Sequence, residues 1–303
     1  MKKKCKDNPN VQIILVNYKS ADDTIECLKS LQKITYSNVE IIVVNNYASD
    51  YDKLDRFIKN LEKCTLIETG SNLGFSGGNN VGIKMAIQKN CDYLLLLNND
   101  TIVTPDFLEP LISCAFLHDN VGIVTGKIMY HFDPNLVWYA GGEISFAGGY
   151  IDHYGYNRKN SDLKNDNDDK KISFATGCLW LIPVNVIKKV GMLSEEYFLY
   201  SEDVDYCCRI MQNKFEIWYT PKSVIYHKVS ASSGNNSKVT QYYSVRNDYY
   251  VFSKYAPKNI KRKALIKLTK RKIESIIRGD ISLRWYLKGV KDFHNNIMGK
   301  IEL

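Results

Sequence analysis

The sequence lacks long apolar segments and closely spaced cysteine pairs. Its aliphatic runs reach only four residues, as in Leu94 to Leu97, far fewer than the roughly 20 apolar residues of a membrane-spanning helix. None of the eight cysteines belongs to a C-x-x-C pair or has the spacing typical of zinc ligands, and several lie within apolar runs. We therefore expect buried, reduced thiols, as in a cytosolic protein. No apolar core follows the basic segment Met1–Lys6, which predicts that it is not a secretory signal.

Positive charge is concentrated near the end of the chain. The 303 residues have a formal net charge of +8, but Lys254 to Leu303 contains 14 Lys/Arg and 4 Asp/Glu, a local +10 that leaves −2 for the remainder. Within this tail, Lys261–Arg278 interleaves basic and apolar residues at helical spacing. One interpretation is a packing helix with a solvated charged face. The other, which we favour, is attachment to an anionic membrane surface. The usual nucleic-acid-binding motifs are missing, so no nucleic acid partner is expected.

The first hundred residues alternate short apolar runs with amphipathic stretches. This alternation is typical of an α/β fold with a mostly parallel central sheet flanked by helices. The predicted strands are Val11–Val16, Ile41–Val44, Leu66–Glu68 and Tyr93–Leu97, and the predicted helices are Asp22–Leu31, Tyr51–Leu61 and Asn79–Lys89. The segment 127–175 is rich in Gly, Tyr, Asp and Asn, and its polar part, Asn157–Lys171, is predicted to be a mobile loop or a hairpin tip. Extended structure is predicted over 172–183 and 215–226, a helix within 194–214, and mainly helices beyond Gln241.

Polar side chains follow three of the predicted strands, as Asn17-Tyr18, Asn45-Asn46 and Asn98-Asn99-Asp100. Ligands of open parallel sheets bind beyond the carboxyl ends of the strands, so we expect these side chains to share one site. The Asp100 carboxylate is suited to hold Mg²⁺ or Mn²⁺, which would bridge a diphosphate. The alternative for Asn98–Asp100 is an Asx turn before Thr104-Pro105.

A glycine-rich motif, Asn72–Asn80, joins the third predicted strand to the third predicted helix. Its glycines would let the backbone approach a bulky ligand, and the helix N-terminus would offer N–H groups to an anion. The alternative is a tight turn with a glycine-rich helix entry. The length of the loop and the amides of Asn79 and Asn80 favour a ligand site.

Three carboxylates, Glu202, Asp203 and Asp205, follow the aromatic run Tyr197–Tyr200. Like charges beside an apolar wall raise at least one carboxyl pKa, which suits a general base. The alternative is that these acids only complement the dipole of a helix N-terminus. His227 gains a functional interpretation only if Asp100 lies beside it, since a lone histidine is more often structural. No partner pattern accompanies the remaining histidines, His118, His131, His153 and His294.

Together these motifs resemble the inverting family-two glycosyltransferases of GT-A type, in particular their rhamnosyltransferase-like branch. The motifs that carry the resemblance are Ile14–Tyr18, Ile41–Asn46, Asn72–Asn80, Leu95–Thr101, Tyr200–Asp205, Val224–His227 and Gly289–Lys300. The resemblance implies a Rossmann-like GT-A catalytic domain over 1–240, with a donor half at about 1–125 and an acceptor half at about 126–240. A basic helical C-terminal region, 241–303, follows it.

The resemblance also implies roles for individual residues. Asn17, Tyr18 and Asn45 match positions that hold the nucleotide base and ribose. The other donor-binding candidates are Asn46, Gly74, Gly77, Gly78, Asn79, Asn98 and Asn99. Asp100 matches the metal carboxylate and His227 a second metal ligand, which implies Mg²⁺ or Mn²⁺ as cofactor. Asp203 matches the general base that Glu202 would assist, and Asp205 and Trp180 are acceptor-side candidates.

Two asparagines depart from the family pattern. Asn98 replaces the first aspartate of the metal-binding DXD motif, and Asn45 replaces the usual aspartate at the base-binding strand end. An amide both donates and accepts hydrogen bonds, so uracil or thymine stays readable at Asn45.

The implied function is transfer of a sugar to a lipid-linked or growing bacterial surface polysaccharide at the cytoplasmic face of the cell membrane. Rhamnose from dTDP-rhamnose is the favoured donor, and UDP-hexose or UDP-galactofuranose is the alternative. The two asparagine departures motivate an alternative of another class, a non-catalytic nucleotide- or carbohydrate-binding relative. A sugar nucleotidyltransferase is disfavoured because Asn17–Ala21 contains no glycine and one lysine, unlike a phosphate-binding loop.

Overall fold

The computed structural model describes residues 8–163, 166–229 and 237–303, so the basic segment Met1–Lys6 lies outside the described residues. The strands are β1 Val11–Asn17, β2 Val39–Asn45, β3 Cys64–Glu68, β4 Tyr93–Leu97, β5 Thr101–Val103, β6 Val121–Tyr130, β7 Leu136–Tyr139, β8 Gly142–Ser145, β9 Tyr150–His153, β10 Arg158–Lys159, β11 Lys170–Ile172, β12 Leu179–Pro183 and β13 Glu216–His227. The helices are α1 Ala21–Leu31, α2 Tyr51–Ile58, α3 Gly74–Gln88, α4 Leu108–Leu117, α5 Val184–Val190, α6 Glu202–Gln212, α7 Lys238–Tyr255, α8 Lys261–Ile277 and α9 Leu283–His294, with short 3-10 turns at Ala48–Asp50 and Asn160–Asp162.

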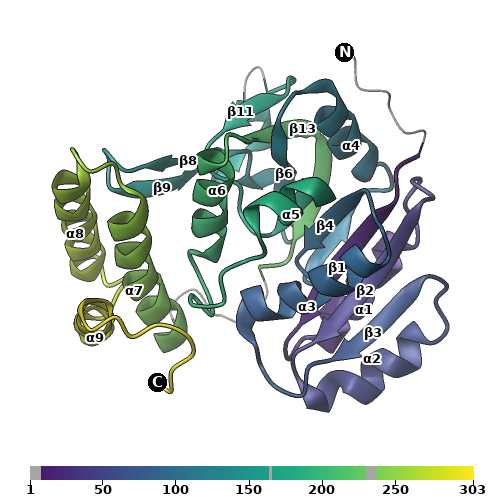
Figure 1. Cartoon of the computed structure of the whole chain (residues 1–303), viewed down its shortest axis with the longest axis horizontal. Coiled ribbons are helices and arrows are strands. Elements are labelled where there is room, and N and C mark those ends of the chain that lie inside the picture. Colours follow the sequence, from purple (N-terminus) through teal and green to yellow (C-terminus); the bar gives the residue numbers. More distant parts are fainter. Residues whose placement is uncertain (1–7, 164–165, 230–236) are drawn as a thin grey trace.

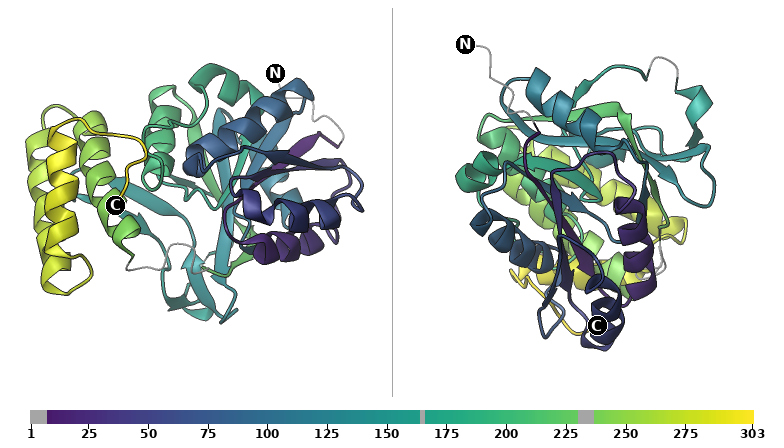
Figure 2. Two further views of the ribbon diagram at one scale, coloured as in Figure 1. Left: turned by 90° about the horizontal axis from the view of Figure 1, so that it is seen from below. Right: turned by 90° about the vertical axis from the view of Figure 1, so that its right-hand side faces the viewer.

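One large sheet runs through the molecule in the order β10-β7-β6-β12-β4-β1-β2-β3, and β13 joins it through β6 (Figure 1). Strands β3, β2, β1 and β4 are parallel, while β12 runs antiparallel beside β4. Helices cover both faces of the sheet, as Figure 2 shows. This is the mostly parallel α/β sheet that the alternating pattern predicts.

The parallel register brings the polar strand ends to one edge of the sheet. Asn17 of β1 is paired with Asn45 of β2, and Asn45 is paired with Glu68 of β3. The apolar residues of β1, β2 and β4 are almost all buried, because helices cover both sides of these strands. The core therefore fixes the strand ends, from which the candidate site residues project.

Two differences from the prediction bear on the candidate site. Helix α3 begins at Gly74, five residues before the predicted start at Asn79, because the glycine-rich motif forms its first turn. Strand β6 was not predicted, although every one of its residues is buried. Its polar and small residues interrupt the apolar pattern, and a Cβ at Gly126 would lie 2.7 Å from the Ser223 carbonyl oxygen of β13. A close approach between two strands explains that glycine.

The C-terminal helices α7, α8 and α9 lie together at one end of the molecule, opposite β1, β2 and β3 (Figures 1 and 2). Helix α7 packs against α6, α8 and α9. No helix in the described ranges combines the length and apolar character that crossing a bilayer requires. The seven described cysteines are free, and all but Cys64 are buried.

Candidate active site

The side-chain amides of the asparagines at the ends of β1 and β2 make hydrogen bonds within the protein. Asn17 donates to the side-chain oxygen of Asn45 (2.8 Å) and to Asp50 (2.9 Å), and Asn45 donates to Glu68 (2.6 Å) and to the Tyr47 carbonyl (2.9 Å). Both asparagine side chains are fully buried. In this structure the two amide groups, which were expected to face the base and ribose, tie β1, β2 and β3 together. Sequence reasoning missed Asp50 and Glu68, which partner them.

Tyr18 stands on the accessible side of these strand ends. Its ring meets that of Tyr47 edge to face, with centroids 5.7 Å apart, and the Lys19 ammonium lies 5.3 Å from one ring and 5.2 Å from the other. Both tyrosines are partly exposed. Aromatic faces beside a cation suit stacking of a base next to a phosphate. Tyr47 and Lys19 escaped the sequence analysis although each lies within two residues of a strand end.

At the glycines of the 72–80 motif, neighbouring protein atoms occupy the space that a side chain would fill. A Cβ at Gly74, where φ is +72°, would lie 2.3 Å from the Phe198 carbonyl oxygen. A Cβ at Gly77 would lie 2.7 Å from the Leu73 Cβ, and one at Gly78 would lie 2.7 Å from a Val16 methyl group. These glycines, which were expected to let a ligand approach the backbone, let α3 pack tightly against its surroundings.

The first N–H groups of α3 are also occupied. Gly74 donates to the Asn72 side chain (2.9 Å) and Phe75 donates to the Phe198 carbonyl (3.0 Å). These contacts oppose the expectation that both groups receive an anion.

The asparagines of the same region make hydrogen bonds to backbone groups of the protein. Asn46 donates to the Gly74 carbonyl (3.0 Å) and Asn79 to the Phe75 carbonyl (3.0 Å). Asn80 donates to the Leu193 carbonyl (2.9 Å) and accepts from its N–H (3.0 Å). The motif thus fastens α3 to β2 and to the loop before α6.

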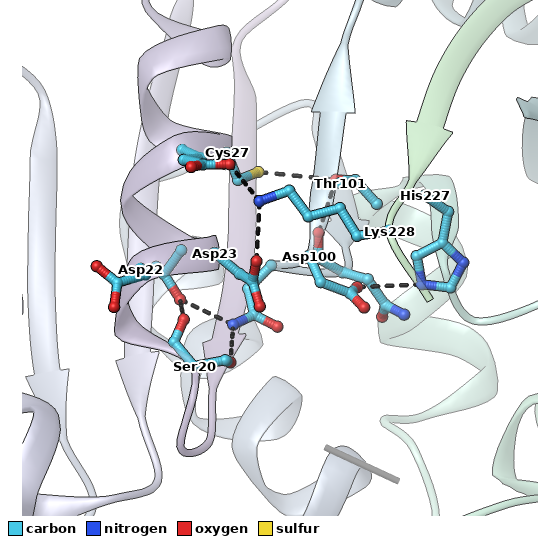
Figure 3. Close-up of polar contacts among 12 residues, drawn as sticks. Ser20, Asp22, Asp23, Cys27, Asp100, Thr101, His227 and Lys228 are labelled. Atoms are coloured by element: carbon cyan, nitrogen blue, oxygen red, sulfur yellow. Dashed lines mark hydrogen bonds and ion pairs between the residues drawn. The ribbon is translucent and has the colours of Figure 1, made fainter. Parts of the chain in front are cut away.

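Asp100 and His227 come together, as the functional interpretation of His227 requires. The Asp100 carboxylate lies 3.1 Å from Nε2 of His227, because β5 and β13 pair with Thr101 opposite His227 (Figure 3). The neighbouring Lys228 donates its backbone N–H to the Asp100 carbonyl and its ammonium to Asp23 of α1 (2.8 Å) and to Glu26. Asn99 instead turns toward α1, donating to Ser20 (2.7 Å) and Thr24 (2.8 Å).

The chemistry of this pair fits a divalent cation. Two adjacent ligand atoms in an octahedral shell lie about 3 Å apart, close to the observed separation of the two side chains. An imidazole ligand suits Mn²⁺ better than Mg²⁺, which prefers oxygen. Asp100 and His227 are therefore the residues that would hold a divalent cation.

Two hydrogen bonds, made by Gly177 and Cys178, link Asp203 to the end of β4. Gly177 donates its N–H to the Asp203 carboxylate (3.3 Å), and the next residue, Cys178, accepts from the N–H of Asn98 (2.9 Å). Asp203 is partly accessible. The structure thus brings the carboxylate cluster beside the strand end that carries Asn98-Asn99-Asp100.

Glu202 and Asp203 differ in the pKa of their carboxyl groups, so one is suited to be an acid and the other a base. Burial raises the pKa of Asp203 to about 6, although the N–H groups of Gly177 and Val204 oppose the rise. Burial and the charge of Asp203 raise the pKa of Glu202 to about 8. At neutral pH Glu202 therefore keeps its proton and Asp203 is ionised. A neutral neighbour also lets the Asp203 carboxylate persist in a poorly solvated place.

Asp205 and Trp180 do not lie on an acceptor surface, which corrects that expectation. Asp205 is fully buried and accepts hydrogen bonds from Tyr255 (2.6 Å), Arg209 (2.8 Å) and Lys254 (2.9 Å). Burial alone would raise its pKa, but these partners hold the pKa below the usual value. Trp180 is fully buried and stacks on Tyr206 in the core. Asp205 joins α6 to α7, and Trp180 packs α6 onto β12.

The backbone before the two acids is strained. Phe198, Tyr200 and Ser201 have φ values of +67°, +67° and +64°, which residues other than glycine rarely adopt. Asn247 of α7 donates to the carbonyl of Tyr197 (3.1 Å) and to those of Leu199 and Tyr200 (both 2.8 Å). Such conformations persist where surrounding contacts hold them, and they cluster at functional sites.

Two further residues of α7 support the segment. Arg246, fully buried, donates to the Tyr197 carbonyl (3.1 Å), and Asp248 accepts from Ser201 (2.9 Å). Sequence reasoning missed Arg246, Asn247 and Asp248, because more than 40 residues separate them from the acids. An uninterrupted Arg-Asn-Asp triplet among aromatic residues was the available signal.

Known proteins share this architecture. The chain is 26% identical over 213 residues to the low-salt glycan biosynthesis hexosyltransferase Agl10 of Haloferax volcanii, covering 69% of this chain and 64% of that protein. It is 23% identical over 255 residues to the dTDP-rhamnosyl transferase RfbF of Shigella flexneri, covering 82% and 81%. The crystal structure of GalNAc-T7 with UDP, GalNAc and Mn2+ superposes with a TM-score of 0.67 at 14% identity, over 97% of this chain and 59% of that one.

The structural likeness confirms the predicted GT-A fold, and the relatives confirm the predicted class of enzyme, a glycosyltransferase. The family described as Glycosyl transferase family 2 matches residues 12–191, more than half of the sequence. The chain belongs to glycosyl transferase family 2.

Proposed function

We propose that the protein is an inverting glycosyltransferase in which Asp203 is the general base. The observation that carries the proposal is the environment of Asp203. Its carboxylate is partly accessible and lies beside a neutral Glu202. Hydrogen bonds through Gly177 and Cys178 link it to the end of β4. Asp203 would accept the proton of the acceptor hydroxyl as its oxygen attacks the anomeric carbon of the donor sugar. Glu202 stabilises the arrangement by remaining uncharged. The proton then rests on the Asp203 carboxylate and is released to solvent.

The donor would lie along the carboxyl ends of β1, β2 and β4. Tyr18, Tyr47 and Lys19 form the surface for the base and its neighbouring phosphate. Asp100 and His227 would hold a divalent cation, which neutralises the nucleoside diphosphate leaving group when bound. Asn17 and Asn45 keep the three strand ends in register beneath the nucleotide.

For the donor sugar we propose rhamnose carried by dTDP. The similarity to the Shigella flexneri dTDP-rhamnosyl transferase over 82% of the chain supports this choice. A UDP-hexose is the second candidate, because a hexosyltransferase is also among the relatives. The acceptor would be a lipid-linked or growing surface polysaccharide.

The C-terminal helices would present the protein to that lipid-linked acceptor at the inner face of the cell membrane. Ile266, Ile273 and Ile277 are 60%, 45% and 80% exposed, and their spacing places them on one face of α8. Leu283 and Leu287 of α9 are more than half exposed as well. Exposed aliphatic side chains among many lysines and arginines suit an anionic bilayer surface.

The donor site can be tested by calorimetry with dTDP, UDP, GDP and CDP, each with and without Mn²⁺ or Mg²⁺. We expect dTDP or UDP to bind tightly only with metal, and Asp100→Ala to abolish this dependence. Lys228→Met, which keeps Asp100, should retain it and acts as the control. Absence of binding for every diphosphate in a folded protein would reject the donor-site assignment.

A second measurement distinguishes the enzyme from a non-catalytic binding relative. Asp203→Asn should bind the diphosphate as wild type does while donor turnover falls by about 10²–10⁴-fold, the range typical for a general base. Equal turnover of the two proteins would reject Asp203 as the base. Diphosphate binding without turnover by wild type, across dTDP-rhamnose and UDP-hexose donors with varied lipid-linked acceptors, would favour the non-catalytic alternative.

A further inference from the structure

Cys114, His118 and Asp169 converge on one point remote in sequence from the catalytic motifs. Their ligand atoms all lie within 4.8 Å of one another, and Nε2 of His118 lies 3.2 Å from the Asp169 carboxylate. Cys114 is buried, while the side chains of His118 and Asp169 are 27% and 17% exposed. One face of the cluster is therefore open to solvent.

Cys114 lies in the last turns of α4, and His118 and Asp169 directly flank α4 and β11. Cys114 and His118 are one turn apart at the end of α4, and the N–H of His118 still donates to the Cys114 carbonyl. Asp169 immediately precedes β11, which pairs with β13. The Trp218 ring of β13 stacks on the His118 imidazole, with centroids 3.5 Å apart and planes 7° apart.

We propose that Cys114, His118 and Asp169 bind a zinc ion, with water as the fourth ligand. Thiolate, imidazole and carboxylate are the three common side-chain ligands of Zn²⁺, whose tetrahedral shell places ligand atoms about 3.3–3.8 Å apart. The ligand atoms of the present cluster lie within 4.8 Å of one another, with 3.2 Å between His118 and Asp169. The neutral imidazole, one thiolate and one carboxylate would balance the two positive charges of the ion.

Binding would release the Cys114 thiol proton to solvent. Burial and the nearby charge of Asp169 raise the pKa of this thiol without metal, so zinc affinity should increase with pH. Without metal, His118 and Asp169 make only a 3.2 Å polar contact with each other beside a buried thiol. The proposed ion would tie Asp169, directly before β11, to the end of α4, and so stabilise β11 against local unfolding.

Cobalt is the sharpest probe, because a thiolate bound to Co²⁺ gives a near-ultraviolet charge-transfer band that oxygen and nitrogen ligands do not. The full chain, stripped with a chelator and kept reduced, is titrated with Co²⁺ and then with Zn²⁺. We expect the band to saturate at one ion per chain and to disappear as zinc displaces cobalt. Ions at Asp100 and His227 do not produce this band.

Three variants complete the test. Cys114→Ser should abolish the band, and Asp169→Asn should weaken zinc binding by at least about 10-fold and remove the zinc-dependent rise in Tm. Cys64→Ser, a partly exposed thiol on β3, is the matched control and should behave as wild type. If Cys114→Ser fails to fold, Asp169→Asn and His118→Gln still decide the outcome. A folded wild type without the band, or a band that persists in Cys114→Ser, would overturn the proposal.

Discussion

The side-chain amide of Asn247 donates a 2.8 Å hydrogen bond to the carbonyl oxygen of Tyr200, whose backbone is left-handed. Asn247 lies on α7, whereas Tyr200 lies two residues before Glu202 on α6. A buried amide from one helix therefore holds the strained entry to another. Because the proposed base is in the first turn of α6, the position of its carboxylate depends on α7.

Replacing Asn247 by leucine should lower activity more than substrate binding. Loss of the amide removes the donor to the carbonyl groups of Leu199 and Tyr200, whereas the Tyr197 carbonyl still accepts from Arg246, at a cost of about 1–3 kcal/mol in the free energy of unfolding. We expect kcat to fall by about 10–100-fold, with a smaller change in the diphosphate dissociation constant. Steady-state kinetics, calorimetry and urea unfolding provide the measurements.

The matched control for that variant is Asn213→Leu. Asn213 donates to the Arg209 carbonyl at the opposite end of α6, away from the strained segment. The Asn213→Leu variant should have a lower free energy of unfolding than wild type and keep the wild-type kcat. Equal losses of kcat in the two variants would show that α6 stability alone matters.

Alanine at Gly74 should be far more harmful than alanine at Gly70. The two glycines have nearly equal φ values, +72° and +71°, so the backbone strain of the substitution is the same. At Gly74 the new Cβ would lie 2.3 Å from the Phe198 carbonyl oxygen, whereas nothing lies within 4 Å at Gly70. Chemical unfolding should show an additional loss of about 1–3 kcal/mol at Gly74. Equal losses would mean that the contact with Phe198 relaxes freely.

The reaction rate should depend on the ionisation of Asp203. Its raised pKa, about 6, means that the base is mostly ionised at pH 7 and becomes protonated as the pH falls below 6. We expect kcat/KM to decrease about tenfold per pH unit below that value and to level off above it. A rate that stays constant from pH 7 to pH 5, with the protein still folded, would contradict Asp203 as the base.

Glu202 should make the protein less stable as the pH rises. Its folded-state pKa of about 8 exceeds the ordinary pKa of a glutamate, 4.5, so the folded chain binds more protons than the unfolded chain between these values. Its stabilising contribution is complete below about 4.5 and is lost as the pH rises through 8. Glu202→Gln should remove this dependence and be the more stable protein at pH 8. Parallel stability curves for the two proteins would contradict the assignment.

Membrane attachment should depend on the exposed isoleucines of α8. The double substitution Ile273→Ser and Ile277→Ser removes two exposed aliphatic side chains from α8. Binding to vesicles rich in phosphatidylglycerol should therefore weaken by at least about 10-fold. Leu117→Ser on α4 removes a side chain that is 68% exposed elsewhere and should change nothing. Sedimentation with vesicles measures this. Equal binding to neutral phosphatidylcholine vesicles would contradict the electrostatic part of the proposal.

Periodicity predicted the parallel strands well, because the runs in β1, β2 and β4 are continuous and the glycines, asparagines and acids fall between them. It missed β6, whose polar residues are buried by partners distant in sequence. The three acids illustrate a second difficulty. Asp203 and Asp205 are two residues apart and chemically identical, but one is partly accessible and the other accepts hydrogen bonds from Lys254 and Tyr255, about 50 positions later.

The same difficulty affects the glycine motif and Trp180. A glycine that admits a ligand and a glycine that admits a neighbouring backbone look alike in a sequence. Only the position of Phe198 decides between them at Gly74. Trp180 in turn stacks on Tyr206, a contact between a strand and a helix that no local pattern encodes.

The bond between Ser201 and Asp248 has a consequence for how this chain can be rearranged. Asp248 also accepts from Lys272 of α8 (2.6 Å), so two side-chain contacts connect a basic helix of the tail to the residue before Glu202. The tail is therefore not an interchangeable module. A chimaera that takes its last 60 or so residues from a relative would need that relative's 197–205 segment as well, and deletion of α8 would alter the reaction centre along with the surface that it carries.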